Sequence, residues 1–212
     1  IVENDANAAA WGEYRFSGVK LPSDLVCVTV GTGIGGGLIF NGDLYRGAHG
    51  VAAEFGHLNI EPGGRLCACG NRGCWEQYAS GNALVREARL LSAERRTEAQ
   101  VLLDLGDGTP EGVEGQHVTI AARKGDPVAL AAFDSLARWL GQGIADVTSL
   151  LDPGCFVIGG GVSEAGDLLL GATRRAFMSA LSGRDSRPIP EIRLAALGNK
   201  AGLVGAADLS RR

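Results

Sequence analysis

Aromatic residues, excess charge and long hydrophobic runs are all scarce in this sequence. Only 6% of its 212 residues are aromatic, and 24 acidic residues nearly balance 20 basic ones, which gives a net charge of -4. This balance offers no electrostatic reason to expect a nucleic-acid partner. No apolar run approaches the roughly 20 residues that a bilayer-spanning helix needs, and no basic and then apolar leader opens the chain. We therefore expect a soluble, cytoplasmic protein with no nucleic-acid or membrane partner.

The sequence also lacks a methionine at its first position. Residue 1 is isoleucine, the single methionine is Met178, and the opening IVEND has the pattern of a strand end with no preceding partner. We therefore expect the chain to be part of a longer protein. Its hydrophobic content of 45% still predicts a globular chain with a substantial core.

Apolar periodicity predicts helices that alternate with strands. The Asn41-Gly42 pair is a strong hairpin signal, so residues 25–46 are expected to form a meander of antiparallel strands. A polar stretch rich in Gly, Asp and Glu, residues 94–116, predicts a surface excursion. Residues 155–161 predict a buried strand that ends in a glycine turn. Helices are expected over residues 6–18, from near Ser80, over 126–153, over 167–181 and over 198–210.

The stretch HLNIEPGGRLCACGNRGCWEQ, residues 57–77, holds three of the five cysteines within eight positions. One residue separates Cys67 from Cys69 and the total is odd, so disulfide bonds are disfavoured. Three thiolates and one imidazole are a common tetrahedral ligand set for structural zinc, and four glycines in this stretch allow the tight turns that such a site needs. The sequence therefore predicts a zinc site formed by His57, Cys67, Cys69 and Cys74.

Two carboxylates flank these ligands. Glu54 precedes the histidine by three residues, and Glu76 follows the last cysteine by two. A metal-held imidazole and two carboxylates suit recognition of a polyol, because the metal orders the loop before the ligand arrives. The alternative is that the two carboxylates are solvated surface charges. The other cysteines, Cys27 and Cys155, lie in apolar strand patterns, which is typical of small buried hydrophobic residues.

Two glycine-rich turns predict close backbone approach. Residues 31–36, GTGIGG, match a dinucleotide fingerprint, but a strand and not a helix follows them, which argues against that class. A Gly-Thr-Gly turn between strands can still bind phosphate through backbone N–H groups and the Thr32 hydroxyl. The second turn, GGG at 159–161, follows a strand and has a simple tight turn as its alternative interpretation.

Asp5 stands where the opening strand pattern ends and a helix begins. One interpretation of this carboxylate is a helix N-cap. The other is a base that accepts the proton of an attacking hydroxyl in phosphoryl transfer, a reaction in which positioning and charge neutralisation dominate.

Together these motifs resemble one family. ENDANAAAWGE, GTGIGGG, AAEFGH, CACGNRGCWEQYASG and VIGGGVS are similar to the successive motifs of the ROK family (repressors, open reading frames, kinases), and most closely to its actinobacterial glucokinases. The likeness covers essentially the whole chain, and the cysteine motif is its most specific part.

The resemblance implies an actin and hexokinase-like (ribonuclease H-like) α/β fold, with two domains that close on glucose and ATP. Residues 1–8 would finish the small domain, 9–197 would form the large domain with the zinc loop, and 198–212 would be a C-terminal helix that returns to the small domain. The family's first phosphate loop, Asp-x-Gly-Gly-Thr, is absent from these residues, in keeping with the expectation of a longer protein. A homo-oligomer, dimer or tetramer, is expected by analogy.

The resemblance also implies residue roles. Asp5 matches the catalytic base of the family, which transfers phosphate from ATP to the 6-hydroxyl of glucose. The same four residues, His57, Cys67, Cys69 and Cys74, match the ligands of a structural zinc ion. The sugar ligands match Asn4, Asp5, Glu54, His57 and Glu76. Nucleotide contacts, with Mg²⁺ bound to ATP, match Thr32, Gly33, Gly159, Gly160 and Gly161.

Two alternatives stay open. A ROK transcriptional repressor shares the zinc loop and the sugar pocket but carries an N-terminal helix-turn-helix, so the sequence upstream of Ile1 would separate it from a kinase. A kinase for another hexose or an N-acetyl amino sugar is the second alternative. The choice between ATP and polyphosphate as the donor is also open.

Overall fold

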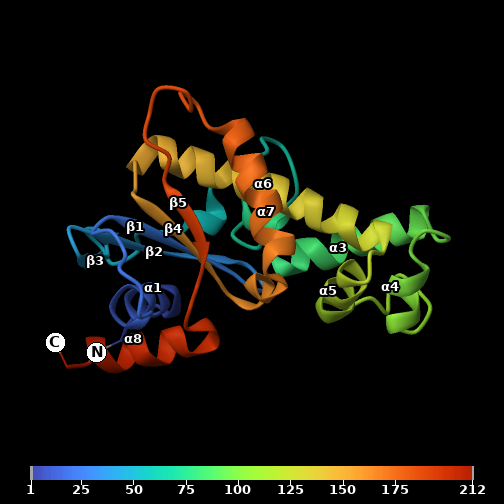
Figure 1. Ribbon diagram of the computed structural model, residues 1–212, viewed down its shortest axis with the longest axis horizontal. Coiled ribbons are helices and arrows are strands. Elements are labelled where there is room, and N and C mark those ends of the chain that lie inside the picture. Colours follow the sequence, from blue (N-terminus) through green and yellow to red (C-terminus); the bar gives the residue numbers. More distant parts are fainter. Residues whose placement is uncertain (1, 212) are drawn as a thin grey trace.

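The computed structural model, which describes residues 2–211, is built around a mixed five-stranded sheet with the order β3-β2-β1-β4-β5 (Figure 1). The first three strands are antiparallel neighbours, as the Asn41-Gly42 hairpin signal predicts, and β4 and β5 extend the sheet in parallel to β1. The strands are β1 (Leu25–Val30), β2 (Ile34–Phe40), β3 (Asp43–Tyr45), β4 (Cys155–Gly159) and β5 (Glu191–Leu194).

Helices cover both faces of this sheet (Figure 1). On one face lie α1 (Asp5–Phe16) and α8 (Ala201–Leu209), and on the other lie α6 (Pro127–Leu151) and α7 (Asp167–Ala180), with α3 (Gly81–Glu94) beside α6. None of the helices within residues 2–211 combines the length and apolar character of a bilayer span. Shorter elements are η1 (Phe55–His57), α2 (Glu76–Ala79), α4 (Gln100–Leu105), α5 (Gly115–Arg123), η2 (Gly161–Ala165) and η3 (Gly198–Lys200).

The two central strands supply side chains to both cores. Successive strand side chains point to opposite faces, so a continuous apolar run fills both. Val26 and Val28 of β1 join the large core under α6, whereas Cys27 joins the smaller core under α1. Cys155 of β4 lies in the smaller core too, so both of these cysteines are buried as expected. Burial raises the pKa of the Cys27 thiol to about 12, which keeps it uncharged.

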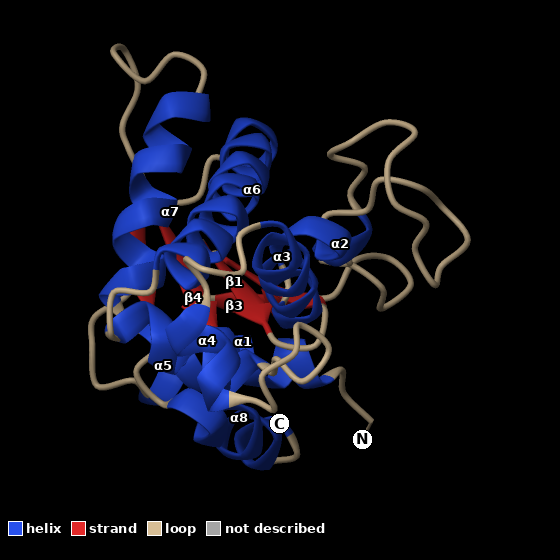
Figure 2. Cartoon of the chain, turned by 90° about the vertical axis from the view of Figure 1, so that its right-hand side faces the viewer, coloured by secondary structure: helices blue, strands red, loops and turns tan. Residues whose placement is uncertain are grey.

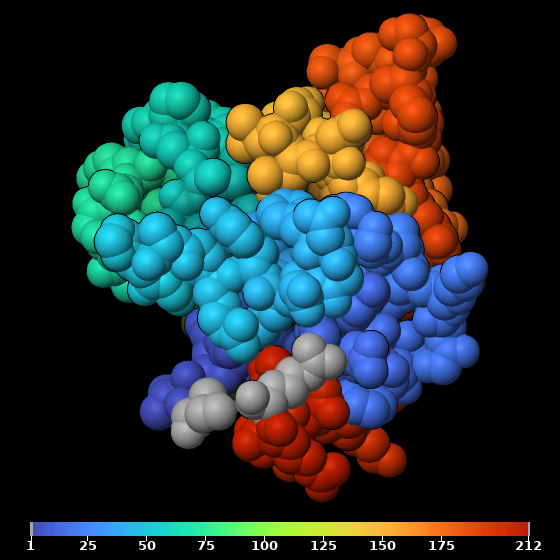
Figure 3. Space-filling view, turned by 90° about the vertical axis from the view of Figure 1, so that its left-hand side faces the viewer, coloured from blue at the N-terminus to red at the C-terminus, as the bar shows by residue number. Residues whose placement is uncertain are grey.

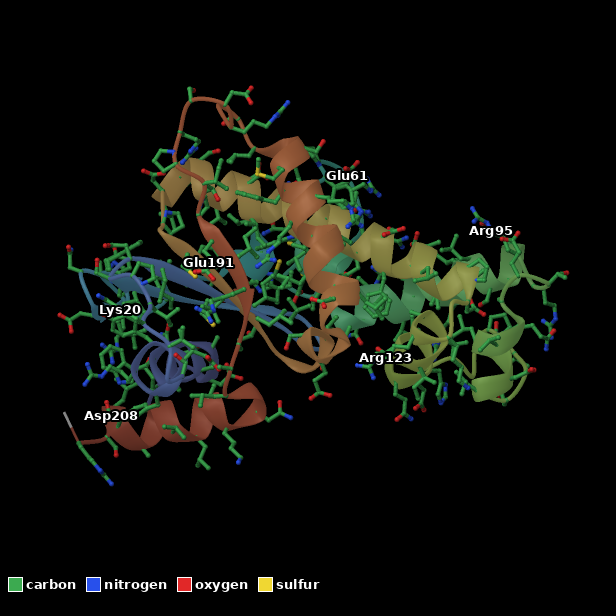
Figure 4. All side chains as sticks on the ribbon, viewed as in Figure 1. Lys20, Glu61, Arg95, Arg123, Glu191 and Asp208 are labelled. Carbon is green, nitrogen blue, oxygen red and sulfur yellow. The ribbon has the colours of Figure 1, made fainter. Side chains whose placement is uncertain are left out.

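Helices α1 and α8 approach each other closely because glycines face the contact. A Cβ atom on Gly205 would overlap the Ala8 carbonyl oxygen, and one on Gly12 would overlap the Ala201 carbonyl oxygen. The Trp11 indole N–H donates to an Asp208 carboxylate oxygen at 2.8 Å across the same contact (Figure 4). Figure 3 shows the C-terminal helix and the N-terminal residues at the same end of the molecule.

The division into residues 1–8, 9–197 and 198–212 remains a prediction, and residues 1 and 212 lie outside the described part of the chain. Both outer segments meet at one place, because α8 packs on α1.

The expected surface excursion over residues 94–116 is wrong in its middle. This segment contains α4 and leads into α5, and Leu102, Leu103 and Val113 are buried in the large core. Asp126 holds it in place from within: one carboxylate oxygen accepts the Leu102 N–H at 3.0 Å while the other caps α6. The polar composition of this segment gave no sign of the buried contact between Leu102 and Asp126, which are 24 residues apart.

Two further differences concern strands. Residues 2–4 pair with no strand of the described chain, whereas the opening pattern predicted a strand end there. Strand β5 (Glu191–Leu194) was not expected, because its four residues alternate charged and apolar side chains too briefly to give a signal.

The substitution Gly205→Ala tests the close packing of α1 on α8. Its Cβ would overlap the Ala8 carbonyl oxygen, so the two helices must separate, and we expect a loss of about 1–3 kcal/mol in the free energy of unfolding. Gly202→Ala is the matched control, because nothing lies within 4 Å of that position, and a change below about 1 kcal/mol is expected. Urea denaturation measures both; equal stability of the two variants would contradict the packing.

Candidate active site and metal centre

The cysteine-rich loop projects from the body beside α2 without regular helix or strand (Figure 2). Backbone pairing between Asn59 and Cys74, and between Leu66 and Arg72, brings its two arms together. The Trp75 N–H donates to the Leu58 carbonyl at 2.8 Å at the base of the loop. The loop therefore starts and ends at one place on the molecular body.

The four expected metal ligands meet at one point. The ligand atoms of His57, Cys67, Cys69 and Cys74 all lie within 4.8 Å of one another. Cys67 Sγ is 3.7 Å from His57 Nδ1, and the Cys69 and Cys74 sulfurs are 3.6 Å apart. Ligands at zinc distances of about 2.0–2.3 Å in a tetrahedron are separated by about 3.3–3.8 Å. The donor types and their spacing thus fit zinc.

The thiols of this cluster differ in their surroundings. Burial raises the pKa of Cys74 to about 12, with the neighbouring thiols adding to the effect, whereas the backbone N–H of Asn71 lowers the pKa of the exposed Cys69. A thiol binds zinc as the thiolate. A divalent cation would supply the positive charge that the buried sulfur needs in order to ionise.

The loop is anchored to the helical core through Trp75. This side chain is fully buried, and its indole N–H donates to the Trp139 carbonyl at 2.8 Å. A Cβ atom on Gly143 of α6 would overlap the indole ring, so a glycine is needed there. The adjoining Cys74 is consequently fixed relative to α6.

Glu76 lies between the metal cluster and the glycine turn of residues 31–33. One of its carboxylate oxygens is 3.0 Å from Cys67 Sγ and 3.9 Å from His57 Nδ1. The other faces Gly33, where a Cβ atom would stand 2.5 Å from it. A side chain at position 33 would displace this carboxylate from its present place.

A cleft of about 540 Å³ brings several of the expected site residues together. The N-terminus of α1, the turn between β1 and β2, α2 and the turn after β4 all contribute to its lining. Asn199 and Gly202, which the sequence did not single out, add the start of α8. The expected site residues in the lining are Asp5, Thr32, Gly33, Glu76 and Gly160.

The N-cap of α1 is Asn4 and not Asp5. Asn4 is the N-cap of α1, because its side-chain oxygen accepts the N–H groups of Ala6 at 2.9 Å and Asn7 at 3.1 Å. Asp5 is the first residue of the helix, and one of its oxygens accepts the Ala6 N–H at 2.8 Å. With the cap position filled by Asn4, the Asp5 carboxylate lines the cleft.

Glu3 and Arg46 brace this helix start, and sequence reasoning missed both. The Arg46 guanidinium donates to one Glu3 oxygen at 2.7 Å, and the Asn7 side-chain amide donates to the other at 3.0 Å. Partial burial raises the pKa of Glu3, but these hydrogen bonds outweigh it and hold the pKa below its ordinary value. The partners are 43 residues apart, so no local signal connects them.

A second cleft, of about 630 Å³, adjoins the first, since Gly31 and Thr32 line both. Its walls come from α3, α5 and η2, and Gly161 lies in its lining. The Arg123 guanidinium donates to the Glu164 carbonyl at 2.8 Å and ties α5 to η2 at the cleft edge (Figure 4). The wall formed by α5 was not foreseen, because no helix was predicted over residues 115–123.

The remaining expected site residues lie outside these two clefts. Glu54 is exposed and is the central residue of a tight turn, in which the Phe55 N–H donates to the Ala53 carbonyl at 2.7 Å. Ala53 adopts φ 69°, a conformation that costs a residue with a side chain of order 1–3 kcal/mol and is found mostly at functional sites. His57 is exposed beside the cluster, and Gly159 is the last residue of β4.

Comparisons with known proteins identify the family and the fold. A model described as ROK family matches residues 1–212. The chain is 56% identical over 211 residues to a glucokinase of Streptomyces coelicolor, covering 100% of this chain and 67% of that protein. It is 30% identical over 209 residues to the xylose repressor of Bacillus subtilis, covering 99% and 50%. The solved ROK family glucokinase from Streptomyces griseus, in complex with glucose and AMPPNP, matches with a TM-score of 0.96 and 56% identity, over 100% of this chain and 68% of that one.

The mixed sheet with helices on both faces is therefore the actin-like α/β fold of sugar kinases, as expected. The chain belongs to the ROK family, which confirms the resemblance seen in its motifs. It spans about two thirds of the length of the glucokinases that it matches.

Metal analysis of the purified full-length protein tests the cysteine cluster. We expect about one zinc ion per chain, because four ligands complete a structural site. Cys69→Ser should remove most of this metal, and because Cys69 is exposed the substitution leaves the core packing unchanged. Cys27→Ala, in the core under α1, is the control and should keep its metal. Unchanged metal content in the Cys69 variant would contradict the site.

Proposed function

We propose that this chain forms the larger part of an ATP-dependent glucokinase that phosphorylates the 6-hydroxyl of glucose. The main support for the proposal is that Asp5, Glu76 and the glycine-rich turn at Thr32 and Gly33 line the same cleft. The 56% identity to a glucokinase supports the same activity. The matching structure in complex with glucose and AMPPNP supports these two substrates.

Asp5 acts as the general base in this proposal. Its carboxylate accepts the proton of the attacking sugar hydroxyl as the oxygen bonds to the terminal phosphorus of ATP and the bond to the β-phosphate oxygen breaks. The N-cap bonds of Asn4 and the Glu3–Arg46 contact fix the helix start that carries it. This rigid placement matters because phosphoryl transfer depends mainly on positioning.

The metal loop orients the sugar. His57 directs Nδ1 toward the sulfur of Cys67, so Nε2 is available to a sugar hydroxyl. Asn4, Glu54 and Glu76 complete the proposed glucose ligands together with Asp5. Zinc held by His57, Cys67, Cys69 and Cys74 would supply structural rigidity and no step of the chemistry.

The two adjoining clefts suit a nucleotide. Thr32 and Gly33 offer a hydroxyl and backbone N–H groups to the phosphates, with Mg²⁺ as their counter-ion. Gly159, Gly160 and Gly161 allow the chain to pass close to the nucleotide. Position 160 requires glycine, because its φ is 84° and a Cβ there would lie 2.5 Å from the Val30 carbonyl oxygen. The larger cleft would hold the adenosine. Domain closure over the substrates and a homo-oligomer remain part of this proposal.

Asp5→Asn in the full-length protein tests the base. The amide keeps the shape and the hydrogen bond from Ala6 but cannot take a proton, so kcat should fall by about 10²- to 10⁴-fold while the affinity for glucose changes little. Asp167→Asn is the matched control, since Asp167 is also the first residue of a helix but is exposed and outside both clefts. A coupled assay for ADP and calorimetric titration of glucose measure both; undiminished kcat in the Asp5 variant removes the assignment.

A panel of sugars in the same assay tests the substrate. We expect the highest kcat/KM with glucose, lower values with other hexoses and N-acetyl amino sugars, and ATP preferred to polyphosphate.

The 30% identity to a xylose repressor keeps a sugar-responsive regulator as the alternative. Sugar binding without ADP formation in the full-length protein, combined with binding to operator DNA, would favour that regulator.

A further inference from the structure

A third cavity lies apart from the two clefts. It has a volume of about 140 Å³ and is enclosed by the end of the metal loop, α2, α3 and α6. None of its lining residues lines either cleft described above. Its polar and aromatic lining consists of Arg65, Gln77, Tyr78, Arg86, Glu87, Ser135, Arg138 and Trp139.

The cavity carries an uncompensated positive charge. Three arginines, Arg65, Arg86 and Arg138, line it together with a single acidic residue, Glu87. Within residues 2–211 none of the three arginines forms an ion pair with a carboxylate. Guanidinium groups are usually paired when they are drawn together, because like charges repel. The lining therefore has a local excess of two positive charges.

Arg86 is the innermost of the three. It is half-buried on α3, and its guanidinium donates to the Gln77 carbonyl, which leaves its other N–H groups for a ligand. Burial and then the charge of Arg65 lower the pKa of Arg86, and they outweigh the Glu87 carboxylate, which raises it. Both effects mean that a bound anion would stabilise the charged form.

Aromatic side chains hold the other two arginines at the rim. The Arg138 guanidinium lies over the Trp139 ring, 4.7 Å from its centroid, and Tyr78 packs against the same ring at 4.7 Å. The Tyr78 hydroxyl accepts the backbone N–H of Arg65 at 2.7 Å. The rim arginines are therefore placed by contacts that leave their N–H donors available.

We propose that this cavity binds a phosphate group, either as free phosphate or as the head of a phosphate monoester. A dianion matches the excess of two charges, and planar guanidinium groups bind phosphate oxygens in pairs. The volume holds one phosphate group, so any organic part would extend past the rim toward Tyr78 and Trp139. This site is separate from the proposed ATP and glucose clefts and does not depend on their function.

Calorimetric titration of inorganic phosphate, and separately of glucose 6-phosphate, into the full-length protein tests the site. We expect a Kd on the order of 1 mM or tighter for at least one of them. The double variant Arg65→Gln/Arg138→Gln should weaken it about tenfold or more. Both arginines are exposed, so the variant is expected to fold. The control Arg175→Gln removes an exposed positive charge from α7, outside the cavity, and should bind as the unmodified protein does.

The comparison between variants isolates this cavity. Phosphate that binds in the catalytic cleft contributes the same signal in all three proteins, because no substituted residue lines that cleft. Weakening with inorganic phosphate identifies free phosphate as a ligand, and weakening with glucose 6-phosphate alone identifies a monoester; both support the proposal. Equal binding by all three proteins, or no binding to any, overturns it. So does a changed oligomeric state of the double variant in size-exclusion chromatography with phosphate binding intact, which would assign the arginines to a contact between copies. Failure of glucose binding or turnover concerns the proposed kinase alone.

Discussion

Three consecutive residues, Cys74, Trp75 and Glu76, connect the cysteine-rich loop to the helical core and to the cleft that contains Asp5. Cys74 belongs to the thiol cluster, Trp75 is buried against α6, and Glu76 turns toward Gly33. Because the three are covalently linked, the position of each restricts the positions of the other two. A metal ion in the cluster would thus order a carboxylate of the cleft without touching a substrate.

Close approach between backbone and side chain makes this arrangement possible. Gly143 leaves room for the Trp75 ring, Gly33 leaves room for the Glu76 carboxylate, and Gly160 passes beside the Val30 carbonyl. The chain contains 33 glycines, and at these positions they serve contact and not flexibility. A methyl group at position 143 or 160 would overlap the buried Trp75 ring or the Val30 backbone, and one at position 33 would displace the Glu76 carboxylate.

Two buried carboxylates in this protein accept backbone N–H groups and connect separate elements. Buried Glu13 accepts the N–H groups of Ala196 at 2.9 Å and Leu197 at 2.7 Å, which ties α1 to the segment before α8. Asp126 does the same for α4 and α6. Asp5 differs because Asn4 already caps its helix, so its carboxylate is directed to the cleft.

The sequence by itself determined the features that depend on neighbours along the chain. The cluster of His57, Cys67, Cys69 and Cys74 is one, since these four residues fall within 18 positions of the chain. The hairpin at Asn41-Gly42 and the long helix that ends before Asp152 are others, because local turn and helix signals specify them. Tertiary structure alone decided that Asp5 shares a cleft with Thr32 and Glu76, that Arg46 braces the start of α1, and that three arginines surround one cavity. These contacts join residues whose separation along the chain carries no signal, and they exist only once the sheet and its helices have packed.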